Sequence, residues 1–137
     1  MATFDEIETA LLAPWTPIED GGMGQWVAAP VAWENVPLDP ATLDAWMEVA
    51  IDSGQQKILT MDDVYTGTPV MMISAYTKPG IGKQASRQLL DAAVAMFRGI
   101  QFVAGTSTLR MYSVSRVVEL PYDGWYKLAV QISFRLF

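Results

Sequence analysis

The chain has 137 residues, of which 51% are hydrophobic and 18% are charged, and this composition predicts one globular domain with a real core. It contains neither cysteine nor histidine, which excludes a disulfide frame, a thiol nucleophile, the commonest general base and the commonest zinc ligand. The net charge of −6 argues against tight binding to nucleic-acid phosphates. We therefore expect a single domain over residues 1–137, without metal or cofactor, that buries part of its apolar surface against a partner.

The first predicted element is a short helix. Thr3 and Glu6 have the spacing of a capping box, apolar residues follow at helical intervals, and Pro14 ends the helix. Residues 14–27 form a loop rich in glycine and proline, with Trp15 and Trp26 near its ends. The two tryptophans either pin the loop to the core, which is the commoner outcome, or belong to a contact surface.

Several strands follow this loop. The sequence predicts a brief strand at Val31–Trp33, a longer one at Ala45–Ile51, a weaker one at Lys57–Met61 and a strong one at Pro69–Thr77. Residues 62–68 are expected to form a polar loop.

The rest of the chain predicts a helix and a hairpin. An apolar stripe begins at Ala85 and reaches Ile100, with Gly99 as the expected C-cap. A strand over Arg110–Leu120 leads into the turn at 121–124, and the last strand alternates apolar and polar residues. The element order predicts an α+β fold, with a mixed, mainly antiparallel sheet and two helices packed on one face.

Targeting signals are not evident in the sequence. No basic stretch followed by an apolar run opens the chain, and no window approaches the length of a membrane span. We expect a protein that is soluble, made in a cytoplasm and not bound to a membrane.

One glycine-containing motif suggests phosphate binding but fails its test. Residues 78–83 lie between a strand and a helix, where a P-loop would lie. A P-loop requires glycine at the position of Thr77 and serine or threonine at the position of Gln84, so both ends fail. We expect the glycines to provide backbone freedom for a tight connection. A small nucleotide- or partner-binding module remains an alternative function.

Catalysis has little support. Serine and threonine are present, but only carboxylates and lysines could activate them, and no carboxylate pair is recognisable. We expect that the protein is not an enzyme.

Charge is unevenly distributed along the chain. Residues 1–63 carry −11 and residues 64–137 carry +5, which together give −6. Either the acidic side of one copy meets the basic side of the next, or the two halves interleave in the fold and the charges mix.

Three landmarks, in order, resemble the lambda-type phage tail terminator family. They are the string from Val31 to Leu38, the glycine-opened strand with its Pro79–Gly82 turn and the following helix, and Asp123–Tyr126 before the last strand. The resemblance covers most of residues 28–137. It implies a structural virion protein, in which six copies form a ring that caps the tail tube and stops its elongation. A head-completion or stopper protein of the neck is the alternative.

The resemblance also implies partners and a place in the virion. The partners would be other copies of the chain, the tail tube protein, the head–tail connector protein and double-stranded DNA passing through the lumen without sequence recognition. The ring would lie at the head-proximal end of the tail and be assembled in the host cytoplasm. An acidic wall would let DNA slide without sticking.

The candidate interface residues come from two predicted loops and the chain's last residue. They are Asp62, Asp63 and Tyr65 in the polar loop, Lys78 and Lys83 around the connection, and Phe137. The apolar run 134–137 is expected to dock, and an edge strand there could pair with a neighbouring subunit.

Overall fold

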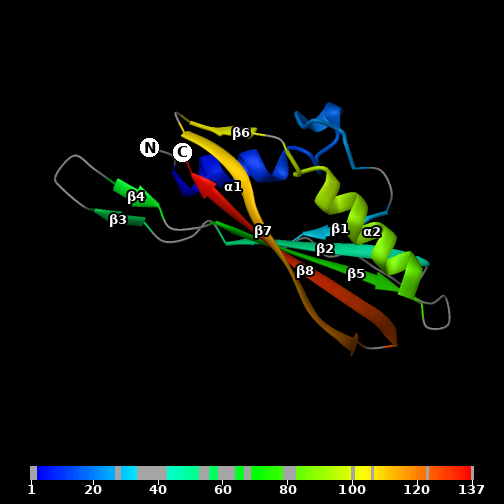
Figure 1. Ribbon diagram of the computed structural model, residues 1–137. Helices are drawn as coiled ribbons and strands as arrows, with labels where there is room; N and C mark the ends of the chain where they lie inside the picture. The colour runs from blue at the N-terminus through cyan, green and yellow to red at the C-terminus, as the bar shows by residue number, and fades with distance from the viewer. Residues whose placement is uncertain are drawn as a thin grey trace.

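The computed structural model describes residues 3–26, 29–33, 43–52, 56–58, 64–66, 69–78, 83–99, 101–105, 107–122 and 124–136 (Figure 1). The helices are α1 (Phe4–Leu12), the short 3₁₀ helix η1 (Ile18–Asp20) and α2 (Lys83–Ala95). The strands are β1 (Val31–Trp33), β2 (Ala45–Asp52), β3 (Gln56–Ile58), β4 (Val64–Thr66), β5 (Val70–Thr77), β6 (Gln101–Ala104), β7 (Ser107–Tyr122) and β8 (Trp125–Leu136).

Six strands form one sheet in the order β1-β2-β5-β8-β7-β6. The β1–β2 pair is parallel, and the other four pairs are antiparallel. Strands β3 and β4 pair only with each other in the described part of the chain, and Figure 1 shows them extending away from the main sheet.

The predicted α+β fold class, with two helices layered on one face of the sheet, was wrong. The molecule is dominated by a curled, mixed sheet that forms a half-barrel, and Figure 1 shows the long β7–β8 hairpin twisting across it. Helix α2 packs on β5 and β8, whereas α1 packs on β6 at the end of the sheet. The curl has a local cause, because the β7–β8 register shifts at Met111/Ser113 and at Val117/Leu120, and such bulges bend and twist strands.

The start of α1 follows its sequence signal. Thr3 is extended and caps the helix, since its hydroxyl accepts a hydrogen bond from the Glu6 amide at 3.1 Å. Ile7 and Leu11 are fully buried, so the face of α1 that they share holds the helix against the rest of the core.

The core centres on Phe97, just after α2. Its ring lies 5.4 Å from the ring of Phe102, 5.6 Å from that of Phe134 and 6.2 Å from that of Trp15. These rings come from the N-terminal loop, β6 and β8, so one aromatic group joins segments that are distant in the sequence.

The last hairpin confirms the pattern in its sequence. Leu128, Val130, Ile132 and Phe134 are buried, and the polar residues between them lie on the other side of β8. Tyr122 pairs with Trp125, and Gly124 between them has a φ of 81°, the left-handed conformation that this tight turn needs.

The loop at 14–27 is pinned to the core, as the commoner of its two interpretations predicted. The rings of Trp15 and Trp26 are buried with their centroids 5.0 Å apart, and the indole nitrogen of Trp26 donates to the Ala29 carbonyl at 2.9 Å. The loop's exposed apolar side chains are instead Ile18 and Met23.

Three short features differ from the predictions. Strand β6 was not predicted, because four residues after a helix carry too little pattern. Strand β4 lies inside the predicted polar loop. Strand β3 agrees with the start of the predicted Lys57–Met61 strand, whose residues 59–61 lie outside the described residues. Helix α2 ends before Gly99, which nevertheless has the positive φ of 72° expected of a C-terminal glycine.

Candidate assembly surface

The main sheet has a face opposite α2, which we call the outer face. It is formed by the residues that alternate with the core residues of each strand. Its described members include Trp46, Glu48, Ala50 and Asp52 of β2; Val70, Met72, Ser74 and Tyr76 of β5; Lys127, Ala129, Gln131, Ser133 and Arg135 of β8; Arg110, Tyr112, Ser113 and Ser115 of β7; and Val103 of β6.

An aromatic cluster closes one end of the outer face. Trp46 and Tyr76 stack with ring centroids 3.9 Å apart, and Trp125 meets Trp46 edge-on at 6.2 Å. The Lys127 ammonium lies 5.5 Å from the Tyr76 ring. Such contacts fix the rings in place. This end of the outer face is therefore a rigid, packed surface.

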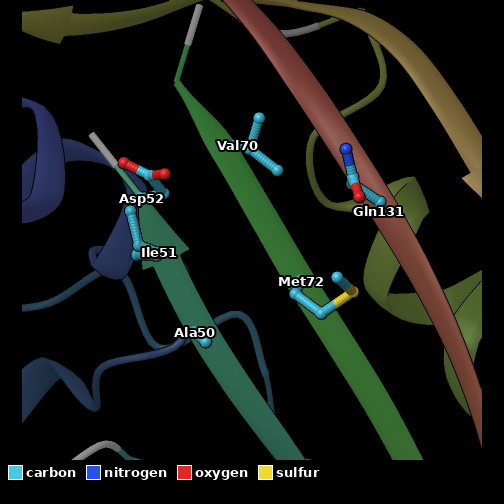
Figure 2. A pocket seen from close by; sticks show the side chains of 6 residues that line it. All are labelled: Ala50, Ile51, Asp52, Val70, Met72 and Gln131. Atoms are coloured by element: carbon cyan, nitrogen blue, oxygen red, sulfur yellow. The ribbon is translucent and has the colours of Figure 1, made fainter. Parts of the chain in front are cut away.

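A shallow hollow lies toward the other end of the same face. Figure 2 shows Val70 and Met72 of β5 on its floor, with Asp52 and Gln131 on the neighbouring strands to either side. Its volume is about 390 Å³, and Ala50 and Ile51 complete the lining. The hollow is open to solvent, unlike the clefts that enclose most of the surface of a small ligand.

Charge changes sign across the outer face from strand to strand. Glu48 and Asp52 on β2 are acidic, β5 carries no charged residue, and Lys127 and Arg135 on β8 are basic. Arg110 on β7 extends the basic side. The acidic and basic halves of the sequence are thus separated on this face. Helix α1, which carries Asp5 and Glu6 in its first turn, packs instead on the uncharged strand β6.

Lys78, a predicted interface residue, is engaged within the chain. Its ammonium lies 2.7 Å from the carboxylate of Asp44, and its backbone amide donates to the Asp44 carbonyl at 3.2 Å. The hydrogen bond from Lys78, reinforced by its positive charge, lowers the pKa of Asp44 below the usual 3.8. Both side chains remain exposed, so the pair is available at the surface.

The other predicted interface residues are only partly placed. Lys83 is the first residue of α2, and Tyr65 lies in β4 opposite Lys57 of β3; the side chains of Lys83 and Tyr65 are not described. Asp62, Asp63 and Phe137 lie outside the described residues. The structure does not bring Tyr65 and Lys78 into one element, because β4 belongs to the small separate sheet.

The basic, aromatic group at the β7 end of the outer face was not predicted from the sequence. The Arg135 guanidinium stacks 3.8 Å above the ring of Tyr112, and Val103 on β6 is 74% exposed. The only signal in the sequence was the excess of basic residues after position 64, which does not say which strands are neighbours.

The described residues contain neither a metal-binding cluster nor a membrane-spanning helix. No cluster of three or more acidic side chains is placed to hold a metal ion among those residues. No helix in the described part of the chain is long and apolar enough to cross a membrane.

The outer face thus combines a packed aromatic end with a charge gradient that runs from β2 to β8 and β7. The sequence matches the phage tail terminator protein family over residues 17–134. The chain therefore belongs to the phage tail terminator family, which is a family of phage tail structural proteins. This assignment confirms the resemblance found in the sequence.

Comparison with solved structures supports the fold. One chain of known structure aligns with a TM-score of 0.65 at 16% identity, covering 98% of this chain and 96% of that chain. At this identity the likeness concerns the fold alone. No curated protein matches the sequence.

Proposed function

We propose that this protein forms a closed ring of about six copies that caps the head-proximal end of the tail tube. The ring stops tube elongation and presents its other side to the head–tail connector. Membership of the tail terminator family over residues 17–134 is the observation that carries this proposal. The protein acts by assembly, without catalysis or a cofactor.

The charge pattern of the outer face supports ring formation. A ring requires a heterologous interface, in which one surface of each copy meets a different surface of the next. Acidic β2 and basic β8 and β7 lie on opposite sides of the uncharged β5, so one copy offers two complementary surfaces. The net charge of −6 also suits a lumen through which DNA passes without binding.

Assembly is tested by light scattering of the purified protein, alone and with tail tube protein. A mass of about six subunits, in either condition, supports the ring. A ring that binds the connector but ignores tube protein would move the protein to the neck as a stopper. A chain that stays monomeric with both partners would overturn the proposal.

We further propose that Asp62, Asp63, Tyr65, Lys78, Lys83 and Phe137 contribute to subunit or partner contacts. Reversing Lys78 and Lys83 to glutamate together should weaken assembly, measured as tail completion or as ring mass. Because Lys78 also pairs with Asp44 inside the chain, Asp44→Ala is the matched control. If Asp44→Ala weakens assembly equally, the intrachain pair, rather than an intersubunit contact, explains the loss.

A further inference from the structure

Within the described residues, strand β7 has a long edge that pairs with no other strand. Strand β6 pairs with β7 only between Ser107 and Arg110, whereas β7 continues to Tyr122. Beyond Tyr112, no other strand in the described ranges pairs with its outward side. An unpaired strand edge presents backbone N–H and C=O groups that readily join another strand.

Apolar side chains are exposed on this edge, at Tyr112 and Val114, and beside it on β6, at Val103. Val103 is 74% exposed, Tyr112 58% and Val114 40%, which makes them three of the most exposed large apolar residues in the described ranges. Val103 and Tyr112 lie on the outer face, while Val114 pairs with Ile132 and lies on the opposite side of the strand. A partner strand added here would therefore cover apolar surface on both faces.

The same edge is basic and partly preorganised. Arg135 is stacked on Tyr112 at 3.8 Å, and Arg110 pairs with Arg135 in the β7–β8 register. The stacking restricts the side chains of Arg135 and Tyr112 before a partner arrives, which lowers the entropic cost of binding. Val103, Arg110, Tyr112, Val114 and Arg135 are together called the basic edge.

The opposite edge of the sheet has the complementary character. It is formed by the three-residue strand β1, which pairs only with β2 in the described part of the chain. The outer face of β2 beside it carries the exposed acids Glu48 and Asp52. We call β1 with these two acids the acidic edge.

We propose that the basic edge of one copy receives the acidic edge of a second copy, so that neighbouring subunits continue one sheet. This inference rests on the proposed ring and specifies its interface. Because each copy has one edge of each kind, the contact repeats head to tail and needs no other protein. Charge complementarity selects this arrangement over pairing of two identical edges, which would bring like charges together.

Cysteine crosslinking tests the interface directly, since the chain has no cysteine of its own. The test chain carries Ala32→Cys on β1 together with Ser113→Cys or Ser115→Cys on β7. Strands paired side by side bring such residues within disulfide range. We expect mild oxidation of the assembled protein to give a ladder of linked copies for at least one pair.

The single variants and a control position decide between arrangements. Each single variant should stay unlinked, and Gln88→Cys on the exposed side of α2 should stay unlinked too. Linked dimers from Ser113→Cys or Ser115→Cys alone would mean that identical edges pair, which overturns the inference. Assembly by light scattering without crosslinks from either pair would overturn the interface and leave the ring standing. Absence of assembly would overturn both.

Charge reversal provides a second readout. Arg135→Glu should weaken assembly roughly 10-fold, because an acidic side chain then faces the acidic edge. Adding Glu48→Lys to the same chain should recover part of that loss. Arg87→Glu on the exposed side of α2 is the matched control and should change assembly little. No recovery in the double variant would contradict the pairing of these two edges.

Discussion

Asp44 and Lys78 are far apart in the sequence, yet they form an exposed ion pair at 2.7 Å. The reason is the antiparallel register of β2 and β5, which sets Ala45 opposite Thr77 and so brings the residues just outside both strands together. Lys78 was predicted as an interface residue from its place in a loop, but its partner within the chain depended on strand pairing. At this scale the sequence identifies charged residues and cannot identify their partners.

The Asp44–Lys78 pair predicts a specific response to acid. The pair lowers the pKa of Asp44 below 3.8, so the folded state binds this proton less readily than the unfolded chain. The contribution of the ion pair to stability is therefore fully present above the pKa that Asp44 has in the unfolded chain. It is lost as the pH falls through the lower pKa that Asp44 has in the folded protein. NMR titration should show the low Asp44 pKa in the wild type and a value near 3.8 in Lys78→Met.

Lys127→Met is the control for that titration, because Lys127 lies over Tyr76 and not beside Asp44. It should leave the Asp44 pKa unchanged. An Asp44 pKa that does not rise in Lys78→Met would show that the ion pair does not persist in solution.

Among the elements, α2 is attached to the sheet by both apolar and polar contacts. Leu90, Ala93 and Val94 bury its apolar stripe. The hydroxyls of Thr77 on β5 and Ser86 on α2 lie 2.9 Å apart and are fully buried. The periodicity of the sequence predicted the stripe, whereas the polar contact arises only because β5 and α2 meet face to face.

Removing both of these hydroxyls should destabilise the fold less than the sum of the two single removals. Thr77→Val or Ser86→Ala leaves a buried hydroxyl without its partner and should cost about 1–3 kcal/mol in the free energy of unfolding. The double variant Thr77→Val/Ser86→Ala should cost clearly less than the two single costs together. Urea denaturation measures all three, and strictly additive costs would show that the two groups are not coupled.

The long strands and the brief strand β1, which lies close to Pro30, were predicted from the sequence, whereas the short strands β6 and β4 were not. The alternation in β8 and the Asp-Gly turn signal predicted the hairpin with β7. Four-residue β6 and three-residue β4 carry too few residues for any periodicity, and they form because neighbouring strands supply hydrogen-bond partners. Proposed contact residues such as Asp62, Asp63 and Phe137 stay predictions, since they lie outside the described residues.

At the scale of the whole molecule, the order of the strands in the sheet determines where acidic and basic residues lie. The sequence alone left open whether its acidic and basic halves separate or mix. They separate on the outer face, from acidic β2 to basic β8 and β7. The surface that we propose for assembly therefore follows the order of the strands in the sheet and not their order in the chain.

Assembly driven by complementary edges should weaken in salt. Raising sodium chloride from about 0.1 M to about 1 M shortens the Debye length from about 10 Å to about 3 Å. The ring mass measured by light scattering should fall, while the urea midpoint of the folded subunit should change much less. Assembly that strengthens in salt would show that apolar burial, and not charge, drives subunit contact.

The sequence by itself determined the capped first helix, the long strands, the last hairpin and the family, because each depends on local periodicity, turn chemistry or an ordered string of residues. Tertiary structure alone decided the half-barrel, the Asp44 partner of Lys78 and the basic edge at Tyr112 and Arg135. These features depend on strand order and on bulges in β7, which are set by packing between residues distant in the sequence. The local sequence pattern does not determine such long-range packing.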